Sequence, residues 1–188
     1  RVRQAALDED SARFYAASIV LGLEALHAKR ILHRDLKPEN VLIDYRGYVK
    51  LGDLGFAKAE PRIESEDVHT VVGTAQYFPP EIASLSEAEA NQHGAKYGKA
   101  LDLWALGVTL FVMALGELPF WADGQLELSE LIINKPLAFP PWPPTCPPPS
   151  DVAADGMLDL LRALLAKDAD DRPTVQEALE HSWVTRDG

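Results

Sequence analysis

The sequence predicts a mainly helical domain with one or two small β-hairpins, and three features favour this fold. Residues 99–116 are apolar nearly all round, which is typical of a helix through the middle of a domain. Apolar residues recur at helical spacing after Asp8 and again over 157–167, which indicates two amphipathic helices. Two short apolar stretches flank a turn sequence that ends in Gly47, which predicts a hairpin. We expect one domain, because 188 residues can bury one core and no linker divides them.

The first helix is expected to begin after Asp8, whose side chain is a candidate N-cap. Glu9 and Asp10 would place acids in the first turn, where negative charge stabilises the helix dipole. The apolar stripe of this helix is expected to comprise Tyr15, Ile19, Leu23 and Leu26, widened by Phe14, Ala17 and Leu21.

The hairpin is expected to pair residues 41–44 with residues 48–51. A three-residue turn with Gly47 in the left-handed conformation fits this spacing. Residues 52–81 show no clear periodicity, and a loop of this length inside a compact domain is usually functional or disordered.

The remaining segments are expected to be short helices and connectors. Residues 84–98 are predicted to form a short helix with a surface excursion, and residues 126–133 a short helix. Eight prolines within residues 136–149 exclude helix and sheet there and indicate a stiff connector. Thr174 and Glu177 form a predicted capping box that opens a last helix ending near His181.

Composition and charge limit the classes of function. The net charge of −11 makes a nucleic-acid-binding surface an unlikely main role, whereas an acidic surface suits a basic peptide partner. The single Cys146 excludes an internal disulfide and fits a reducing compartment, so we expect a cytoplasmic protein, with the nucleus open. No signal peptide is visible, and the longest uncharged run, residues 103–116, is too short to span a bilayer.

Side chains suited to catalysis or metal binding are concentrated in residues 33–40, which read H-R-D-L-K-P-E-N. Asp53, at the end of the second strand, adds a further carboxylate. Asp35 can accept a proton from a hydroxyl group, and Lys37 can reach the same space and stabilise a phosphate. Asn40 and Asp53 offer oxygen ligands of the type that Mg²⁺ takes. This set of residues is what phosphoryl transfer requires.

These residues resemble the catalytic-loop signature of protein kinases. Further motifs follow in the order expected for that family: D-L-G from Asp53, G-T-A-Q-Y-F-P-P-E from Gly73, D-L-W-A-L-G from Asp102, and D-R-P ending at Pro173. The chain is similar to the large C-terminal lobe of a eukaryotic-type serine/threonine kinase, AGC-like and nearest to the cyclic-nucleotide-dependent kinases. Residues 1–188 would form this part of the domain, with a catalytic loop at 33–40 and an activation segment at 53–81.

The resemblance implies roles at the reaction centre. Asp35 would be the catalytic base, assisted by Lys37 and Thr74, with a protein or peptide as substrate. ATP would be bound through Lys37, Glu39, Asn40, Leu42 and Asp53, of which Asn40 and Asp53 would hold Mg²⁺. Leu42 would lie under the adenine ring, and Glu39 could instead recognise a basic residue of the substrate.

The resemblance also implies supporting and regulatory roles. Glu81 and Arg172 would form a buried ion pair, and Asp102 would hold the backbone of the catalytic loop. His33 and Leu54 would stack in an internal hydrophobic column. Arg34 would pair with a phosphate on Thr70, which would order the activation segment. The four remaining histidines receive no role: His27, His69, His93 and His181.

The sequence departs from the kinase pattern in several places. No glycine-rich loop and no lysine of the ATP-binding small lobe precede Asp8, so we expect this chain alone to bind ATP weakly and to transfer phosphate poorly. Gln76 and Val112 stand where kinases with a preference for basic substrates often carry Glu. The alternatives are a catalytically idle lobe or interaction module and, third, a small-molecule phosphotransferase. The oligomeric state is not indicated by the sequence.

Overall fold

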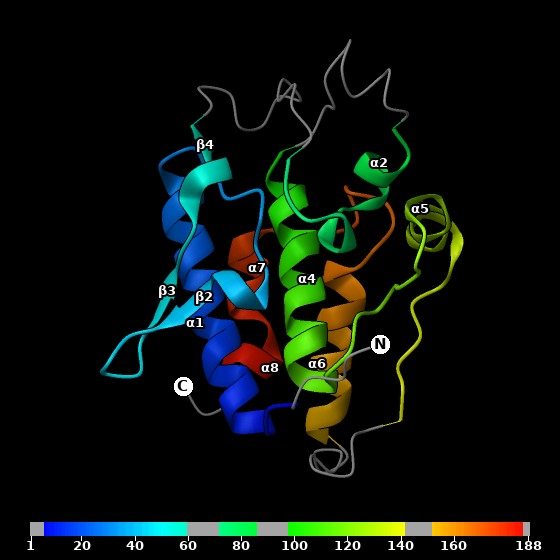
Figure 1. The fold of residues 1–188 in the computed structure, drawn as a ribbon. Helices are drawn as coiled ribbons and strands as arrows, with labels where there is room; N and C mark the ends of the chain where they lie inside the picture. The colour runs from blue at the N-terminus through cyan, green and yellow to red at the C-terminus, as the bar shows by residue number, and fades with distance from the viewer. Residues whose placement is uncertain (1–5, 60–71, 86–97, 142–151, 186–188) are drawn as a thin grey trace.

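The computed structural model describes residues 6–59, 72–85, 98–141 and 152–185. The described residues form a helical body with two small sheets at one side of it, as the sequence predicts (Figure 1). The helices are α1 (Glu9–Ala28), α2 (Pro80–Ala83), α4 (Lys99–Leu115), α5 (Gln125–Asn134), α6 (Val152–Leu164), α7 (Val175–Glu180) and α8 (Ser182–Thr185).

Each sheet has two antiparallel strands. In the first, β2 (Val41–Ile43) pairs with β3 (Val49–Leu51), with Val41 opposite Leu51. The turn between them closes through Gly47, whose φ of +88° is the left-handed conformation that the sequence predicts. Both strands are one residue shorter at the turn than expected. The reason is that the Asp44 carboxylate accepts the N–H groups of Arg46 and Tyr48 and so begins the turn early.

The strands of the second sheet lie before and after this hairpin in the sequence. It pairs β1 (Ile31–Leu32) with β4 (Lys58–Ala59), with Ile31 opposite Ala59. Three short 3₁₀ turns lie at the ends of the strands or before α2: η1 (Pro38–Asn40), η2 (Leu54–Phe56) and η3 (Ala75–Tyr77). Residues 52–85 therefore contain local structure wherever they are described, although their sequence shows no periodicity.

Helix α1 begins as predicted, because the Asp8 carboxylate accepts the N–H of Ser11 at 2.9 Å. Its buried face is narrower than predicted and consists of Ala12, Ala16, Ile19, Val20, Leu23 and His27. Phe14 and Leu21 are 51% and 54% exposed, so assigning them to the apolar stripe was wrong. The small residues Ala12 and Ala16 are buried in place of these larger side chains, on the helix that packs against α4.

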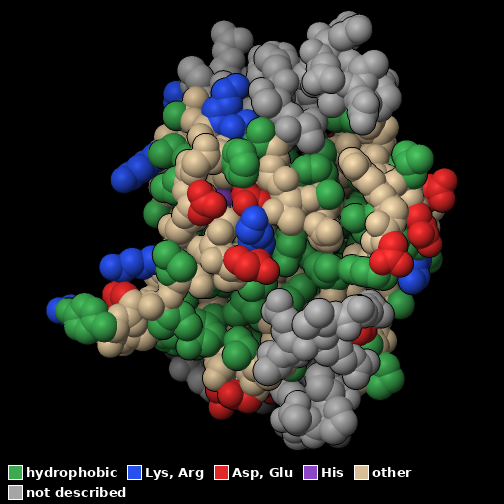
Figure 2. All heavy atoms as spheres, viewed as in Figure 1, with side chains coloured by type: hydrophobic (Ala, Val, Ile, Leu, Met, Phe, Trp, Pro, Cys, Tyr) green, Lys and Arg blue, Asp and Glu red, His purple; other side chains and the backbone are tan. Residues whose placement is uncertain are grey.

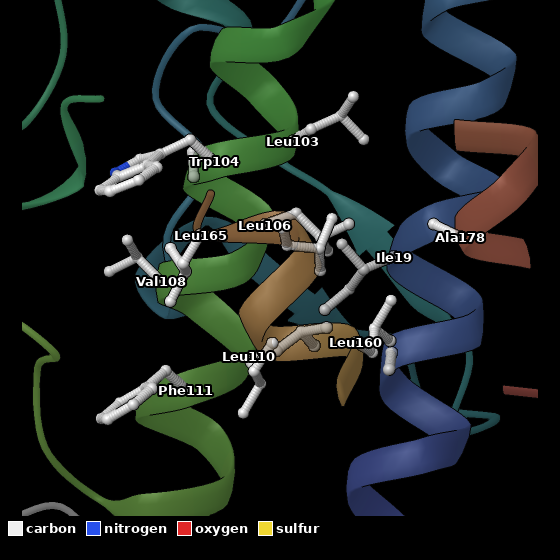
Figure 3. Packing of buried hydrophobic residues seen from close by; sticks show 14 of the residues in the cluster. Ile19, Leu103, Trp104, Leu106, Val108, Leu110, Phe111, Leu160, Leu165 and Ala178 are labelled. Carbon is white, nitrogen blue, oxygen red and sulfur yellow. The ribbon is translucent and has the colours of Figure 1, made fainter. Parts of the chain in front are cut away.

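Helix α4 is the centre of the core (Figure 3). Trp104 and Leu106 are fully buried, and both α1 and α6 pack against this helix. Gly107 permits the close approach of α6, because a Cβ there would lie 2.9 Å from Leu164 and Leu165. The helix ends at Gly116, whose φ of +73° and N–H bond to Val112 form a left-handed cap.

The C-terminal helices differ from expectation mainly in their bounds. Helix α6 begins five residues before and ends three residues before the predicted 157–167, so Lys167 lies beyond its end. The capping box of Thr174 and Glu177 is present at the start of α7, and the following short helix α8 was not predicted. Most of the predicted segment 84–98 and most of the proline-rich stretch lie outside the described residues. No helix among the described residues is long and apolar enough to cross a bilayer.

Candidate active site

The loop from His33 to Asn40 follows β1, and its first residues are hydrogen-bonded to the core helix α4. Asp102 of α4 is fully buried, and its carboxylate accepts the backbone N–H groups of His33 and Arg34, both at 2.9 Å. Arg34 has a φ of +68°, a strained conformation for a residue with a side chain. The two hydrogen bonds from the loop to Asp102 offset this strain, and they fix where the loop leaves β1.

His27 also bonds to Asp102, and the sequence analysis gave this histidine no role. Its Nε2 lies 2.8 Å from Asp102 Oδ2, and the side chain is 5% exposed. Because a carboxylate can only accept, Nε2 carries the hydrogen. The sequence does contain a signal: His27 follows Ile19 and Leu23 at intervals of four, so it continues the buried face of α1.

Asp35, Lys37 and Thr74 form a closed triangle of polar contacts. Lys37 Nζ donates to Asp35 Oδ2 at 2.7 Å and to Thr74 Oγ1 at 2.8 Å. Thr74 Oγ1 donates to Asp35 Oδ1 at 2.7 Å. Asp35 is 3% exposed, so these contacts are made in a largely desolvated position. The three residues that the sequence assigned to the reaction centre are therefore in direct contact.

The protonation of Asp35 is governed by these neighbours. Burial alone raises the pKa of Asp35, but the hydrogen bonds from Lys37 and Thr74, with the charge of Lys37 and a bond from Asn40, outweigh it. The net result is a pKa below the ordinary value for aspartate. Asp35 is therefore ionised at neutral pH and able to accept a hydrogen bond from a hydroxyl group.

Asn40 and Asp53 lie at neighbouring ends of the β2–β3 hairpin, joined by the bond from Gly52 N–H to the Asn40 carbonyl. Asn40 Nδ2 donates to the Asp35 carbonyl at 2.7 Å, and no hydrogen bond among the described residues uses its Oδ1. Asp53 has a φ of +50° and an exposed carboxylate that accepts the N–H of Gly55 at 3.4 Å. Both side chains thus have oxygen available for a cation.

This pair alone would not enclose a metal. No group of three or more His, Cys, Asp and Glu side chains within residues 6–59, 72–85, 98–141 and 152–185 could hold a metal ion. Two protein oxygens nevertheless fit Mg²⁺, which usually keeps waters and phosphate oxygens as its other ligands.

The hairpin side of the site exposes apolar side chains. Leu42 is 54% and Leu54 is 49% exposed, with Phe56 at 42%. His33, by contrast, is fully buried, and its Nε2 donates to the Gly52 carbonyl at 3.2 Å. The expected stacking of His33 and Leu54 in an internal hydrophobic column stays a prediction, because one side chain is buried and the other is half-exposed.

The segment before α2 crosses the catalytic loop at Gly73. A Cβ at this position would lie 2.5 Å from the Arg34 carbonyl oxygen, and the φ of +112° also excludes most side chains. Arg34 Nε donates to the Phe56 carbonyl. Thr70, the expected phosphorylation site, lies outside the described residues.

Glu81 of α2 and Arg172 form a bidentate ion pair, with both nitrogen–oxygen distances at 2.7 Å. The Arg172 side chain is 0% exposed, and it also donates to the carbonyls of Ala100, Ala166 and Lys167. Its guanidinium lies over the Trp104 ring at 5.1 Å. The segment that carries Thr74 is thus anchored to the helical core.

A cavity of about 520 Å³ opens beside the triangle. Figure 2 shows charged side chains of both signs near the centre of this face, between the hairpin and α5. Burial raises the pKa of Tyr77, and the negative charges of Glu39 and Asp35 raise it further, so the phenol stays protonated. The cavity is lined by residues of the loop, of η3 and the Thr74 before it, of the C-terminal end of α4 and of the segment after α4, among them Lys37, Glu39, Thr74, Tyr77, Val112 and Trp121.

Comparison with known proteins agrees with this geometry. The sequence model of the family described as "Protein kinase domain" matches residues 1–184. The cAMP-dependent protein kinase type 3 of Saccharomyces cerevisiae is 37% identical over 161 residues, which are 86% of this chain and 35% of that protein. This identity confirms the likeness to cyclic-nucleotide-dependent kinases.

Two further relatives match nearly the whole chain. The serine/threonine-protein kinase ssp1 of Schizosaccharomyces pombe is 38% identical over 97% of this chain and 27% of its own length. The calcium/calmodulin-dependent protein kinase kinase of Caenorhabditis elegans is 34% identical over 97% of this chain and 31% of its own length. The chain therefore spans only about a third of the length of these relatives.

Proposed function

Because this chain belongs to the protein kinase family, we propose that it carries the reaction centre of a kinase that phosphorylates serine or threonine in proteins. The observation that carries this proposal is the triangle of Asp35, Lys37 and Thr74 beside a cavity of about 520 Å³. A base, a cation and a hydroxyl donor in direct contact are suited to a hydroxyl nucleophile and a phosphate.

In this function Asp35 accepts the hydrogen bond of the substrate hydroxyl and orients its oxygen toward the phosphorus. Its low pKa means that it holds no proton at the start, so Oδ1 and Oδ2 are both acceptors. Lys37 Nζ, already 2.7 Å from Asp35, places a positive charge where the transferring phosphoryl group develops negative charge. Thr74 holds one oxygen of Asp35 and so limits its rotation.

Asn40 and Asp53 are the residues that would hold Mg²⁺. Asn40 offers Oδ1 because its Nδ2 is already bound to Asp35, and Asp53 offers an exposed carboxylate. When bound, Mg²⁺ would neutralise the charge of the ATP phosphates. The exposed apolar side chain of Leu42, on the same hairpin, is suited to contact the adenine ring.

The cavity beside the triangle is suited to an extended segment of a protein substrate. Glu39 adds negative charge to its lining, which favours a basic residue near the phosphorylated one. Val112 gives the cavity an apolar wall where the kinase pattern often has an acid, so Glu39 would carry this preference. Control by a phosphate on Thr70 through Arg34, and a cytoplasmic location, stay predictions.

Phosphate transfer by the full-length protein that contains this chain tests the proposal. Asp35→Asn should lower kcat on a serine peptide by at least about 10²-fold while ATP binding persists, because the charged acceptor for the hydroxyl is lost whereas the proposed Mg²⁺ ligands Asn40 and Asp53 are unchanged. Asp10→Asn, an equivalent change at a side chain that is 93% exposed, should leave kcat unchanged. Equal loss in both variants, or no transfer by the unaltered protein, would favour a catalytically idle module.

A further inference from the structure

A second cavity, of about 490 Å³, shares no lining residue with the one beside Asp35. Three segments meet there: the C-terminal end of α1, the N-terminal end of α4 and residues 169–176, which lead into α7. Its apolar lining comes from Ala28, Ala100, Leu103 and Pro173. A cavity of this size and character is typical of sites for small organic molecules.

His27 lies in the wall of this cavity. Its Nε2 is bound to Asp102, but its Nδ1 is buried and has no hydrogen-bond partner among the described residues. A buried polar atom without a partner costs free energy, so such an atom beside a cavity favours a ligand that can bond to it. Nδ1 is the ring nitrogen left for a ligand, and in the tautomer that carries its hydrogen on Nε2 it accepts, so the matching ligand group is an N–H donor.

The charged residues around the cavity favour the same kind of ligand. Arg172 cannot attract an anion there, because its buried guanidinium is saturated by Glu81 and by three backbone carbonyls. Lys99, the other cation of the lining, already takes part in an interaction within the protein. The carboxylates of Glu24 and Asp170 line the cavity, and neither has a hydrogen bond or ion pair within the described part of the chain. The balance of available charge is negative.

We propose that this cavity binds a small apolar molecule that carries a protonated amine. The apolar body would contact Ala28, Ala100 and Leu103, and the ammonium group would donate to His27 Nδ1 or to the carboxylates at the rim. Neither ATP nor the protein substrate of the proposed function has this chemistry, so the site is distinct from the reaction centre.

The position of the cavity gives the ligand a regulatory effect. Two of its wall residues bond to residues that support the active site: His27 bonds to Asp102, which holds the loop of residues 33–40, and Arg172 bonds to Glu81 of α2. A ligand that fills the cavity favours the state in which both connections are made. This effect on catalysis rests on the proposed function, whereas binding itself does not.

Benzylamine is a suitable probe, titrated into full-length protein with isotope-labelled histidine. We expect the imidazole signals of His27 to shift in a saturable way, and benzyl alcohol, which has the same shape without the charge, to bind several-fold more weakly. Glu24→Gln should weaken benzylamine binding about threefold, as for one exposed ion pair. Ala28→Trp, at an exposed position on the rim, should fill the cavity and abolish binding without disturbing the core.

The matched control is Glu130→Gln, an equivalent loss of charge at an exposed residue of α5, which should leave the affinity unchanged. If Glu24→Gln and Glu130→Gln weaken benzylamine binding equally, the amine is attracted by the net negative charge of the protein and does not bind at this cavity. Equal affinity for benzyl alcohol, binding that persists in Ala28→Trp, or no shift at His27 would also overturn the proposal. None of these results depends on kinase activity, so each is distinct from a failure of the proposed function.

Discussion

Thr74 donates its hydroxyl hydrogen to Oδ1 of Asp35 at 2.7 Å, although the two residues are 39 positions apart in the sequence. Lys37 contacts both of them. The acceptor oxygen of Asp35 is therefore held correctly only when the segment that carries Thr74 lies against the catalytic loop. The placement of residues 72–77 therefore determines the orientation of Asp35, the proposed base.

Replacing Thr74 should separate the role of its hydroxyl from the role of its methyl group. Thr74→Ala removes a hydrogen bond to a charged group, worth about 1.5–3 kcal/mol, so kcat should fall about 10- to 100-fold. Thr74→Ser keeps the hydroxyl and should retain most of the rate. Steady-state phosphorylation of a serine peptide measures both, and equal rates for the Ala and Ser variants would contradict the role of the hydroxyl.

Substitutions at Gly73 and Gly47 can test whether the close approach of Gly73 to Arg34 is required. Both have positive φ, but a Cβ at Gly73 would meet the Arg34 carbonyl oxygen at 2.5 Å, whereas a Cβ at Gly47 would meet nothing within 4 Å. Gly73→Ala should abolish peptide phosphorylation because Thr74 is displaced from Asp35. Gly47→Ala should cost about 1–2 kcal/mol of stability and leave kcat intact. Similar activity in the two variants would show that the close approach is not required.

The ion pair of Glu81 and Arg172 should be important for stability. Glu81→Gln leaves the buried guanidinium without its charged partner, so the free energy of unfolding should fall by about 3 kcal/mol. Chemical denaturation measures this change. The comparison is the ion pair of Arg13 with Asp10, whose side chain is 93% exposed, and Asp10→Asn should have little effect. A small effect of Glu81→Gln would mean that the carbonyl contacts alone satisfy Arg172.

Lys167 should make stability depend on pH in the alkaline range. Burial, together with the positive charge of Arg172, lowers the pKa of Lys167 from 10.5 to about 8. Between these values the unfolded chain binds more protons than the folded one, so the free energy of unfolding should rise with pH from about 8 to 10.5. Lys167→Met should flatten this rise, measured by denaturation at several pH values, whereas Lys135→Met on the surface should not.

The environment of Lys167 explains the low pKa. Its ammonium lies 4.0 Å from the centre of the Phe120 ring and donates to the Ile132 carbonyl at the end of α5. These contacts favour the charged form, but burial and the neighbouring Arg172 oppose it more strongly. An unchanged pH dependence in Lys167→Met would assign the effect to another group.

The elements with strong local signals were predicted well from the sequence. Helix α4, the hairpin turn at Gly47 and the capping box at Thr174 each follow from periodicity or turn chemistry within a few residues. Local chemistry also indicated Asp35 and Lys37, which belong to one dense motif, whereas Thr74 was expected beside them only from the resemblance to protein kinases.

What the sequence did not reveal depends on packing between distant segments. The exposure of Phe14 and Leu21 follows from which face of α1 the other helices cover, and no local pattern encodes that. The pairing of β1 with β4 joins two dipeptides that are too short to give a signal. The bond of His27 to Asp102 spans 75 positions, so the buried spacing of His27 could indicate burial but not its partner.

Asp102 makes the loop of residues 33–40 more resistant to local opening than most loops are. Loops usually open to solvent at low free-energy cost, whereas the amides of His33 and Arg34 are bonded to a fully buried carboxylate of the central helix. We expect their hydrogens to exchange with water far more slowly than those of a solvent-exposed loop. The loop is irregular in shape, yet its backbone is bonded to the core, and its geometry should persist as long as the fold does.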